Sequence, residues 1–307
     1  MKIRIASRAS ALALWQTEHI RDLLQNAGHE VEIVTMKTKG DVILDTPLAK
    51  IGGKGLFTKE LENAMLSGAA DIAVHSLKDV PTQFEAGLKL ACVCTRADTR
   101  DAMLSMKYSS LDELPHGARL GTTSLRRRMQ ILARRPDLEI ISLRGNVNSR
   151  IEKLKRGDFD AIILAMAGIN RLGLDALVTH VAPLDTVPAM GQGALGIEAT
   201  TANAEILTAI DFLNDEKTII ETTIERAFVD TLNGGCQAPI GVHAELSGES
   251  VKVRAVLGLV DGSEVLSDEK TFAKADYESA GVTFANEFIA RGAKELLARA
   301  EEMANNI

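Results

Sequence analysis

The first part of the sequence alternates between strand-like and helix-like patterns, and this alternation limits the possible folds more than any other feature. Apolar runs predict strands at 2–6, 31–36 and 71–74. Amphipathic segments predict helices between them, at 10–27 and 58–66. Such alternation predicts an α/β fold with a mostly parallel sheet, whose ligand-binding edge lies at the carboxyl ends of the strands.

Two further regions follow. From residue 101 to residue 188 the alternation returns, with strands predicted at 119–121, 139–143 and 161–165 and helices at 124–135 and 147–156. In the last region three strands are predicted, at 242–246, 251–259 and 264–272, with glycine-containing turns between them. One long helix is predicted after them, at 277–303. We therefore predict two α/β domains and a smaller α+β C-terminal domain with a three-stranded antiparallel sheet.

Charge is unevenly distributed along the chain. The net charge is −7, which taken alone argues against polyanionic ligands. Residues 119–156, however, hold eleven basic and three acidic side chains, a net charge of +8, which leaves −15 for the rest. Most of these basic residues are arginines, whose planar guanidinium matches the two oxygens of a carboxylate or phosphate. Thr122-Thr123-Ser124 and Arg144-Gly145-Asn146 precede the two helices predicted here, and both junctions favour anion binding. The remaining basic residues fit a solvated helix face.

Two motifs look functional but are better explained by structure. The segment Gly191-Gln192-Gly193-Ala194-Leu195-Gly196 matches the dinucleotide fingerprint, yet an extended stretch follows it where a helix should begin. We interpret it as a flexible crossing between domains. Cys92 and Cys94 share one face of a predicted strand, and no second Cys or His pair accompanies them. We expect core packing there and no metal site.

Asp79 and Cys236 are the single residues best suited to chemistry. Asp79 follows a predicted strand and has Lys78 beside it, so it fits a general acid or base. A turn aspartate before Pro81 explains the same pattern. Cys236 follows Gly234-Gly235 at the end of a predicted helix, where a thiol is accessible for reaction or modification. From the residues alone it fits an unreactive loop cysteine equally well.

These residues together resemble the porphobilinogen deaminase (hydroxymethylbilane synthase) family over essentially the whole chain. The resemblance is carried by Leu12-Ala13-Leu14-Trp15-Gln16, the run from Gly40-Asp41 to Phe57, His75-Ser76-Leu77-Lys78-Asp79-Val80-Pro81, Gly121-Thr122-Thr123-Ser124-Leu125-Arg126-Arg127, Leu143-Arg144-Gly145-Asn146, Gly191-Gln192-Gly193-Ala194 and Gly234-Gly235-Cys236-Gln237. Several of these motifs are specific to the family.

The resemblance implies a transferase of haem and tetrapyrrole biosynthesis. Such enzymes join four porphobilinogen molecules head to tail with loss of four ammonia molecules, and release the linear tetrapyrrole by hydrolysis. The chain grows on a dipyrromethane cofactor held by a thioether, here to Cys236. The implied fold has two domains like those of periplasmic binding proteins and a third that carries the cysteine. The implied boundaries are 1–97 with 193–214 for domain 1, 98–192 for domain 2 with an Arg-rich cleft, and 215–307 for domain 3.

The resemblance also implies roles for individual residues. Asp79 is expected to protonate the leaving amine, stabilise the resulting azafulvenium cation and contact the pyrrole N–H groups. The residues implied to contact the cofactor are Asp79, Lys78, Thr122, Ser124, Arg126, Arg127, Arg150 and Gln192. Those implied to hold substrate and the growing oligopyrrole chain are Arg8, Ser10, Gln16, Arg144, Arg150 and Arg171. Those implied for a lid are Lys50, Lys54 and Phe57.

Alternative functions remain open from the residues alone. A non-catalytic anion- or solute-binding α/β module explains the α/β halves and the arginines, but not Cys236 or the third domain. Nucleic-acid binding is disfavoured because aromatic residues make up only 4% of the chain and the remainder is acidic. The longest apolar run, 161–169, is too short to cross a membrane, and three cysteines suggest a reducing compartment. We expect a cytoplasmic monomer with no membrane or nucleic-acid partner.

Overall fold

The structure is a computed structural model that describes residues 1–38, 58–235 and 238–306. The chain divides into two compact units. Of the described residues, the first comprises 1–38, 58–97 and 193–219. The second comprises 98–192, 220–235 and 238–306. Because the second unit combines the segments predicted as domains 2 and 3, the division into three domains stays a prediction.

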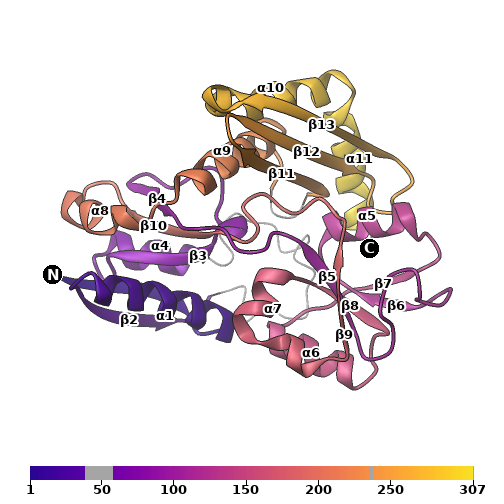
Figure 1. Cartoon of the computed structure of the whole chain (residues 1–307), viewed down its shortest axis with the longest axis horizontal. Coiled ribbons are helices and arrows are strands. Elements are labelled where there is room, and N and C mark those ends of the chain that lie inside the picture. The colour runs from indigo at the N-terminus through magenta and orange to yellow at the C-terminus, as the bar shows by residue number, and fades with distance from the viewer. Residues whose placement is uncertain (39–57, 236–237, 307) are drawn as a thin grey trace. The chain divides into compact units, whose positions relative to one another are not determined.

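The first unit is built on a sheet of five strands among the described residues, in the order β2-β1-β3-β10-β4 (Figure 1). Its strands are β1 (Lys2–Arg8), β2 (Glu30–Met36), β3 (Ile72–Ser76), β4 (Leu88–Val93) and β10 (Leu195–Thr200). Its helices are α1 (Ala11–Asn26), α4 (Lys59–Leu66), α8 (Ala204–Ile210) and the 3-10 helices η1 (Leu77–Asp79) and η3 (Asp211–Leu213). Neighbouring residues of β3 face opposite sides, so Ile72 packs with Ile20 of α1, whereas Ala73 packs with Leu61 of α4.

The second unit contains a similar sheet, in the order β7-β6-β8-β5-β9 within the part of the chain that is described. Its strands are β5 (Asp101–Ser105), β6 (Arg119–Gly121), β7 (Glu139–Ile141), β8 (Ala161–Ala165) and β9 (His180–Leu184). Its helices are α5 (Leu125–Arg134), α6 (Val147–Lys155), α7 (Met166–Leu172) and the 3-10 helix η2 (Leu174–Leu177). The two faces of β8 belong to different buried clusters, one with Ile151 of α6 and one with Ile131 of α5.

The C-terminal part of the second unit has its own sheet and core. A three-stranded antiparallel sheet, β11-β12-β13, packs against helices (Figure 1). The strands are β11 (Ile240–Ser247), β12 (Ser250–Gly258) and β13 (Val265–Ala273), and the helices are α9 (Glu216–Thr231), α10 (Tyr277–Ala290) and α11 (Ala293–Asn305), with the 3-10 helix η4 (Lys274–Asp276) before α10. The core is aromatic, because Phe228, Phe284 and Phe288 are fully buried against one another.

Buried carboxylates of α9 protect the open edge of this sheet. β11 is an edge strand, so part of its backbone has no strand partner. The carboxylate of Glu225 accepts from Ala244 N at 2.9 Å, and that of Glu221 accepts from Leu246 N at 3.0 Å. Glu225 also accepts from Gly191 N at 2.7 Å. One helix therefore fixes both β11 and the backbone just before Gln192.

The structure confirms the predicted fold class, an α/β protein with a C-terminal antiparallel sheet, and corrects two details. The single helix predicted at 277–303 is two helices, because Gly292 has a φ of 88° and interrupts the chain between α10 and α11. The five-stranded sheets are also more mixed than predicted. β10 begins at the edge where its neighbour β3 ends, and β5 begins where its neighbour β8 ends. Each of these two pairs is therefore antiparallel. Among the described residues, no helix is long and apolar enough to cross a membrane.

Candidate active site

In the first unit, polar residues gather where β1 and β3 end. These two strands are parallel, so their carboxyl ends lie at the same edge of the sheet. β1 ends at Arg8, and Ser10 then caps α1 by accepting a hydrogen bond from Ala13 N. β3 leads into the 3-10 helix that holds Lys78 and Asp79. This edge therefore brings together four of the predicted site residues beside a helix N-terminus, which attracts anions.

Asp79 lies on a firmly held turn. Leu77 is fully buried and donates its backbone N–H to Ala194 O at 3.0 Å, and Val80 N closes the turn onto Leu77 O at 3.1 Å. Asp79 itself is exposed. Its carboxylate is thus presented to solvent on a fixed backbone, as a proton-transfer group requires.

Gln16 has a different environment from the one that its predicted substrate contact suggests. Its side chain is only 3% exposed, and its amide nitrogen donates to Ser76 Oγ at 2.8 Å. This bond joins α1 to the last residue of β3, three positions before Asp79. Gln16 thus fixes the end of the strand that leads to Asp79.

A buried group of titratable residues beneath this edge was not predicted from the sequence. His75 Nε2 lies 3.2 Å from the Glu198 carboxylate, and both side chains are almost completely buried. Glu62 of α4 is buried near Glu198 and accepts a hydrogen bond from Thr58 Oγ1 at 2.6 Å. His75 precedes Asp79 by four residues, so the strand that leads to the turn also carries this group. No local sequence pattern indicated this buried group, because His75 and Glu198 are far apart in the sequence.

The protonation of Glu62 leads to a testable pH dependence. Burial raises the pKa of Glu62; the Thr58 hydrogen bond opposes this, and the charge of Glu198 adds to it. A carboxyl group whose pKa is raised by folding stabilises the fold at low pH, and this contribution is lost as pH rises through the folded pKa. We expect Glu62→Gln, which cannot ionise, to gain stability relative to the parent protein as pH rises from about 5 to about 8. Urea unfolding at both pH values measures this, and an unchanged difference between the two proteins would show that Glu62 is ionised throughout.

In the second unit, helix N-termini and arginines gather at the corresponding edge. Ser124 caps α5 by accepting from Arg127 N, and Asn146 caps α6 by accepting from Ser149 N at 2.9 Å. Thr122 directly follows β6, and its hydroxyl accepts a hydrogen bond from Ser124 N at 3.2 Å. The Arg150 Nε–H donates to Gly145 O at 2.9 Å. Burial lowers the pKa of Arg144, which lies between β7 and α6.

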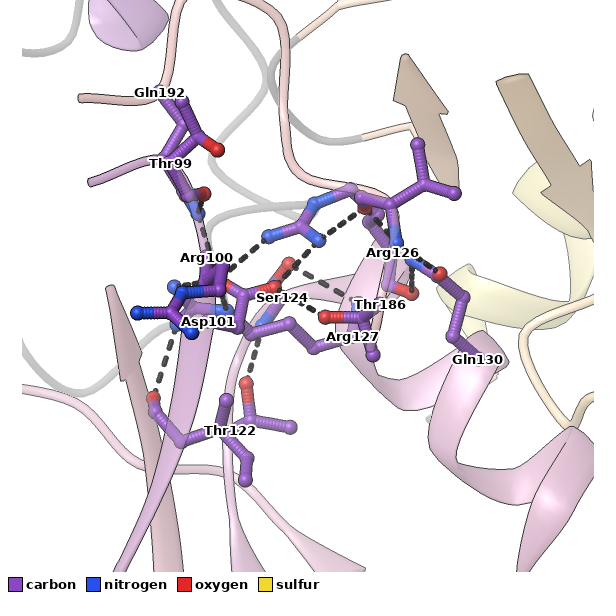
Figure 2. A network of polar contacts seen from close by, with 12 residues as sticks. Thr99, Arg100, Asp101, Thr122, Ser124, Arg126, Arg127, Gln130, Thr186 and Gln192 are labelled. Carbon is purple, nitrogen blue, oxygen red and sulfur yellow. Dashed lines mark hydrogen bonds and ion pairs between the residues drawn. The ribbon is translucent and has the colours of Figure 1, made fainter. Parts of the chain in front are cut away.

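At this edge a single buried carboxylate joins several of the predicted residues (Figure 2). Asp101 is completely buried at the start of β5. Its Oδ2 accepts from Arg126 Nη1 at 2.7 Å and from Thr186 Oγ1 at 3.0 Å. Its Oδ1 accepts from Arg127 Nη2 at 2.8 Å and from Gln192 Nε2 at 2.9 Å. Burial by itself raises the pKa of Asp101, but the two guanidinium groups outweigh this and hold the pKa well below its usual range.

Asp101 changes how the predicted arginines are understood. We predicted that Arg126 and Arg127 bind ligand carboxylates directly, yet they are only 4% and 7% exposed and both are paired with Asp101. Gln192, predicted at the same site, is 1% exposed and bonds Asp101 and the backbone oxygen of Thr99. The direct contacts stay predictions. Asp101 itself was missed, since it begins a strand that no local pattern had indicated.

The glycines that match the dinucleotide fingerprint are explained by close backbone packing. Gly193 has a φ of 94°, and a Cβ there would lie 2.5 Å from Ala97 O. A Cβ on Gly196 would lie 3.0 Å from side-chain atoms of Leu77 and Leu90. The motif runs into β10 and not into a helix. The boundary between the two units falls at Gln192 and Gly193, as expected for a chain crossing.

Several predicted site residues fall outside the part of the chain that the structure describes. These are Cys236, Lys50, Lys54 and Phe57. Cys92 and Cys94 are described, and both are buried thiols. Burial raises the pKa of Cys92 to about 12, so this thiol stays protonated and unreactive, as core packing implies. Among the described residues, no group of His, Cys, Asp and Glu is arranged to hold a metal ion.

Comparison with known proteins identifies two family models along the chain. Residues 3–208 match the model described as porphobilinogen deaminase, dipyromethane cofactor binding domain. Residues 219–290 match the model described as porphobilinogen deaminase, C-terminal domain. The cofactor-domain match thus includes both sheet edges described above.

Curated relatives match over nearly the whole chain. A porphobilinogen deaminase of Campylobacter fetus is 75% identical over 99% of this chain and 100% of its own. One from Campylobacter curvus is 64% identical with the same coverage. Among solved structures, the periplasmic VFT2 domain of Bordetella pertussis BvgS matches 68% of this chain and 85% of its own at 15% identity, with a TM-score of 0.42. The substrate-binding protein of an amino acid ABC transporter matches 69% of this chain and 91% of its own at 13% identity, with a TM-score of 0.38.

Proposed function

The chain belongs to the porphobilinogen deaminase family and has that activity in tetrapyrrole biosynthesis, and on this premise we propose which of its residues perform the reaction. The reaction joins four porphobilinogen molecules head to tail, releases four ammonia molecules and yields hydroxymethylbilane by hydrolysis. The observation that carries the assignment is the exposed carboxylate of Asp79 on a fixed turn, at an edge shared with Arg8 and a capped helix. The chemistry needs a proton donor beside groups that hold carboxylates.

The donor set of the second unit fits a dipyrromethane cofactor. Each pyrrole ring of this cofactor carries carboxylate side chains, and such groups are bound by guanidinium groups, hydroxyls and helix N-termini. The structure brings these donor types to one sheet edge. There Ser124 caps α5, and Arg150 Nε donates to Gly145 O. The residues that we propose to hold the cofactor are Lys78, Asp79, Thr122, Ser124, Arg126, Arg127, Arg150 and Gln192. When bound, the cofactor supplies the pyrrole carbon to which the first substrate is joined.

We propose that Asp79 handles the protons of the incoming porphobilinogen. As an acid it protonates the aminomethyl nitrogen, so that ammonia leaves with the electron pair of the C–N bond. As a carboxylate it then stabilises the cation that remains on the substrate. It next accepts the ring proton that is lost when the new C–C bond has formed. Arg8, Ser10, Arg144, Arg150 and Arg171 bind the carboxylates of substrate and product, while Gln16 holds the end of β3.

Cys236 is proposed as the attachment site of the cofactor. Its thiol forms the thioether, and the buried Cys92 and Cys94 are too enclosed to compete for this role. We also propose that the protein works as a cytoplasmic monomer. The small number of cysteines, three in the chain, supports a reducing compartment. Gel filtration with light scattering tests the monomer, for which a mass near 33.0 kDa is expected.

A single assay separates this function from simple anion binding. Purified protein incubated with porphobilinogen should release one ammonia for each porphobilinogen consumed and accumulate a linear tetrapyrrole. A binding module of similar architecture would bind porphobilinogen saturably and release no ammonia. Consumption without ammonia release, or binding alone, would contradict the proposed function.

A further inference from the structure

Among the described residues, the buried pair Arg126 and Arg127 has one acidic partner for two positive charges. Both guanidinium groups are almost completely buried, and both pair with the same carboxylate, that of Asp101. Two positive charges and one negative charge leave a net charge of +1. Burying an unbalanced charge is costly unless an anion completes it. One further negative group would therefore balance the charge of these three side chains.

The hydrogen bonds of the two arginines leave donors for such a group. Arg126 donates to Asp101 through both terminal nitrogens and to Val187 O at 2.7 Å. Arg127 donates to Asp101 through Nε and Nη2 and to Ile163 O at 3.0 Å. Within the described residues, these contacts use three of the five N–H groups of each guanidinium. Two N–H groups on each arginine remain for an anion.

Asp101 also determines where those donors lie. Adjacent like charges repel, and arginine side chains have many rotamers, so an unbridged pair would separate. Asp101 accepts from both guanidinium groups, and Thr186 and Gln192 hold its carboxylate from two other segments of the chain (Figure 2). Asp101 is therefore fixed independently of the arginines that it orients.

We propose that Asp101 is a positioning residue that holds Arg126 and Arg127 in the orientation that binds one carboxylate of the dipyrromethane cofactor. This inference rests on the proposed function, because it assigns the missing negative charge to that cofactor. Asp101 touches neither cofactor nor substrate and acts through the two arginines. The two arginines and Asp101 together have a net charge of +1, which one ligand carboxylate balances.

The variant Asp101→Asn tests this role. Asparagine keeps the shape of the side chain, but it removes the charge and puts an amide donor against guanidinium donors. We expect the purified variant to contain at least a fivefold smaller fraction of cofactor-bearing protein than the parent, measured by intact mass. Thermal unfolding, recorded on the same samples, gives the accompanying loss of stability.

Glu221→Gln is the matched control. Glu221 is a buried carboxylate of the same unit that accepts from Leu246 N. The Glu221→Gln variant should have a lower unfolding midpoint than the parent protein and carry the cofactor in the same fraction of molecules. If Asp101→Asn loads as completely as Glu221→Gln, Asp101 is structural only and the inference fails. If the parent protein itself carries no added mass and consumes no porphobilinogen, the proposed function fails instead.

A second variant decides the matter if Asp101→Asn does not fold. Thr186→Val keeps every charge and removes only the hydroxyl that holds Asp101 Oδ2. Cofactor-free protein carrying this substitution should acquire the cofactor from porphobilinogen two to five times more slowly than parent protein, with an unfolding midpoint close to the parent's. Loading at the parent rate would overturn the positioning role.

Discussion

Replacing Cys236 with serine is expected to give a folded protein whose intact mass is that of the bare polypeptide and whose porphobilinogen consumption is undetectable. The parent protein should be heavier by two porphobilinogen molecules less two ammonia molecules, because each joining step releases one ammonia. A serine hydroxyl is a much weaker nucleophile than a thiolate and forms no thioether. The cofactor then has no covalent attachment, so chain growth has no starting point.

The folded state should survive this change, since the described residues on either side of it are held by contacts of their own. Gly234 donates its N–H to Val229 O at 2.9 Å, and a Cβ on Gly234 would come within 2.5 Å of Ile240. Beyond the cysteine, Ala238 N donates to Gly235 O at 3.0 Å. None of these contacts uses the thiol. The unfolding midpoint of Cys236→Ser should therefore match that of cofactor-free parent protein.

Cys92→Ser is the matched control for this experiment. Its thiol is buried and donates to Ile210 O at 3.2 Å, and its pKa of about 12 keeps it protonated. This variant should lose some stability but keep both the added mass and the activity. If the added mass persists in Cys236→Ser and is lost in Cys92→Ser, the attachment site has been assigned to the wrong cysteine.

Local chemistry accounts for most of what the sequence predicted correctly. Ser10, Ser124 and Asn146 were expected at helix starts, and each accepts a backbone hydrogen bond as an N-cap. Capping depends on residues three positions apart, so it can be read from a short window. The basic segment between residues 119 and 156 was likewise visible as a run. Arg126, Arg127 and Arg144 accordingly follow the ends of β6 and β7, while their contacts with a ligand stay predictions.

Tertiary contacts account for what the sequence did not predict. Asp101 meets Arg126 across 25 positions, Thr186 across 85 and Gln192 across 91. His75 and Glu198 meet because β3 and β10 pair, and β10 returns to the first unit after a long excursion. No local pattern marks a carboxylate that will be buried by such distant partners. For the same reason β5, which begins at Asp101, and β9 escaped prediction.

Asp79→Asn is expected to reduce turnover by about two to four orders of magnitude while the protein keeps its cofactor and its stability. The amide has almost the shape of the carboxylate, but it can neither donate an acidic proton to the leaving nitrogen nor stabilise a cation. Asp79 is exposed on a turn held by the buried Leu77, so its substitution leaves the backbone hydrogen bonds of that turn unchanged. Steady-state assays, intact mass and thermal unfolding on one preparation measure the three quantities together.

The combination of these measurements distinguishes chemistry from binding. If Asp79 only helps to hold the substrate, Asp79→Asn should raise KM and leave kcat nearly unchanged, because ground-state binding is lost without loss of proton transfer. If it performs the proton transfers, kcat falls and saturation with porphobilinogen does not restore it. Asp22→Asn, an exposed aspartate on α1, should behave like the parent protein in both respects. A near-normal kcat in Asp79→Asn would therefore show that this carboxylate does not transfer the protons of the reaction.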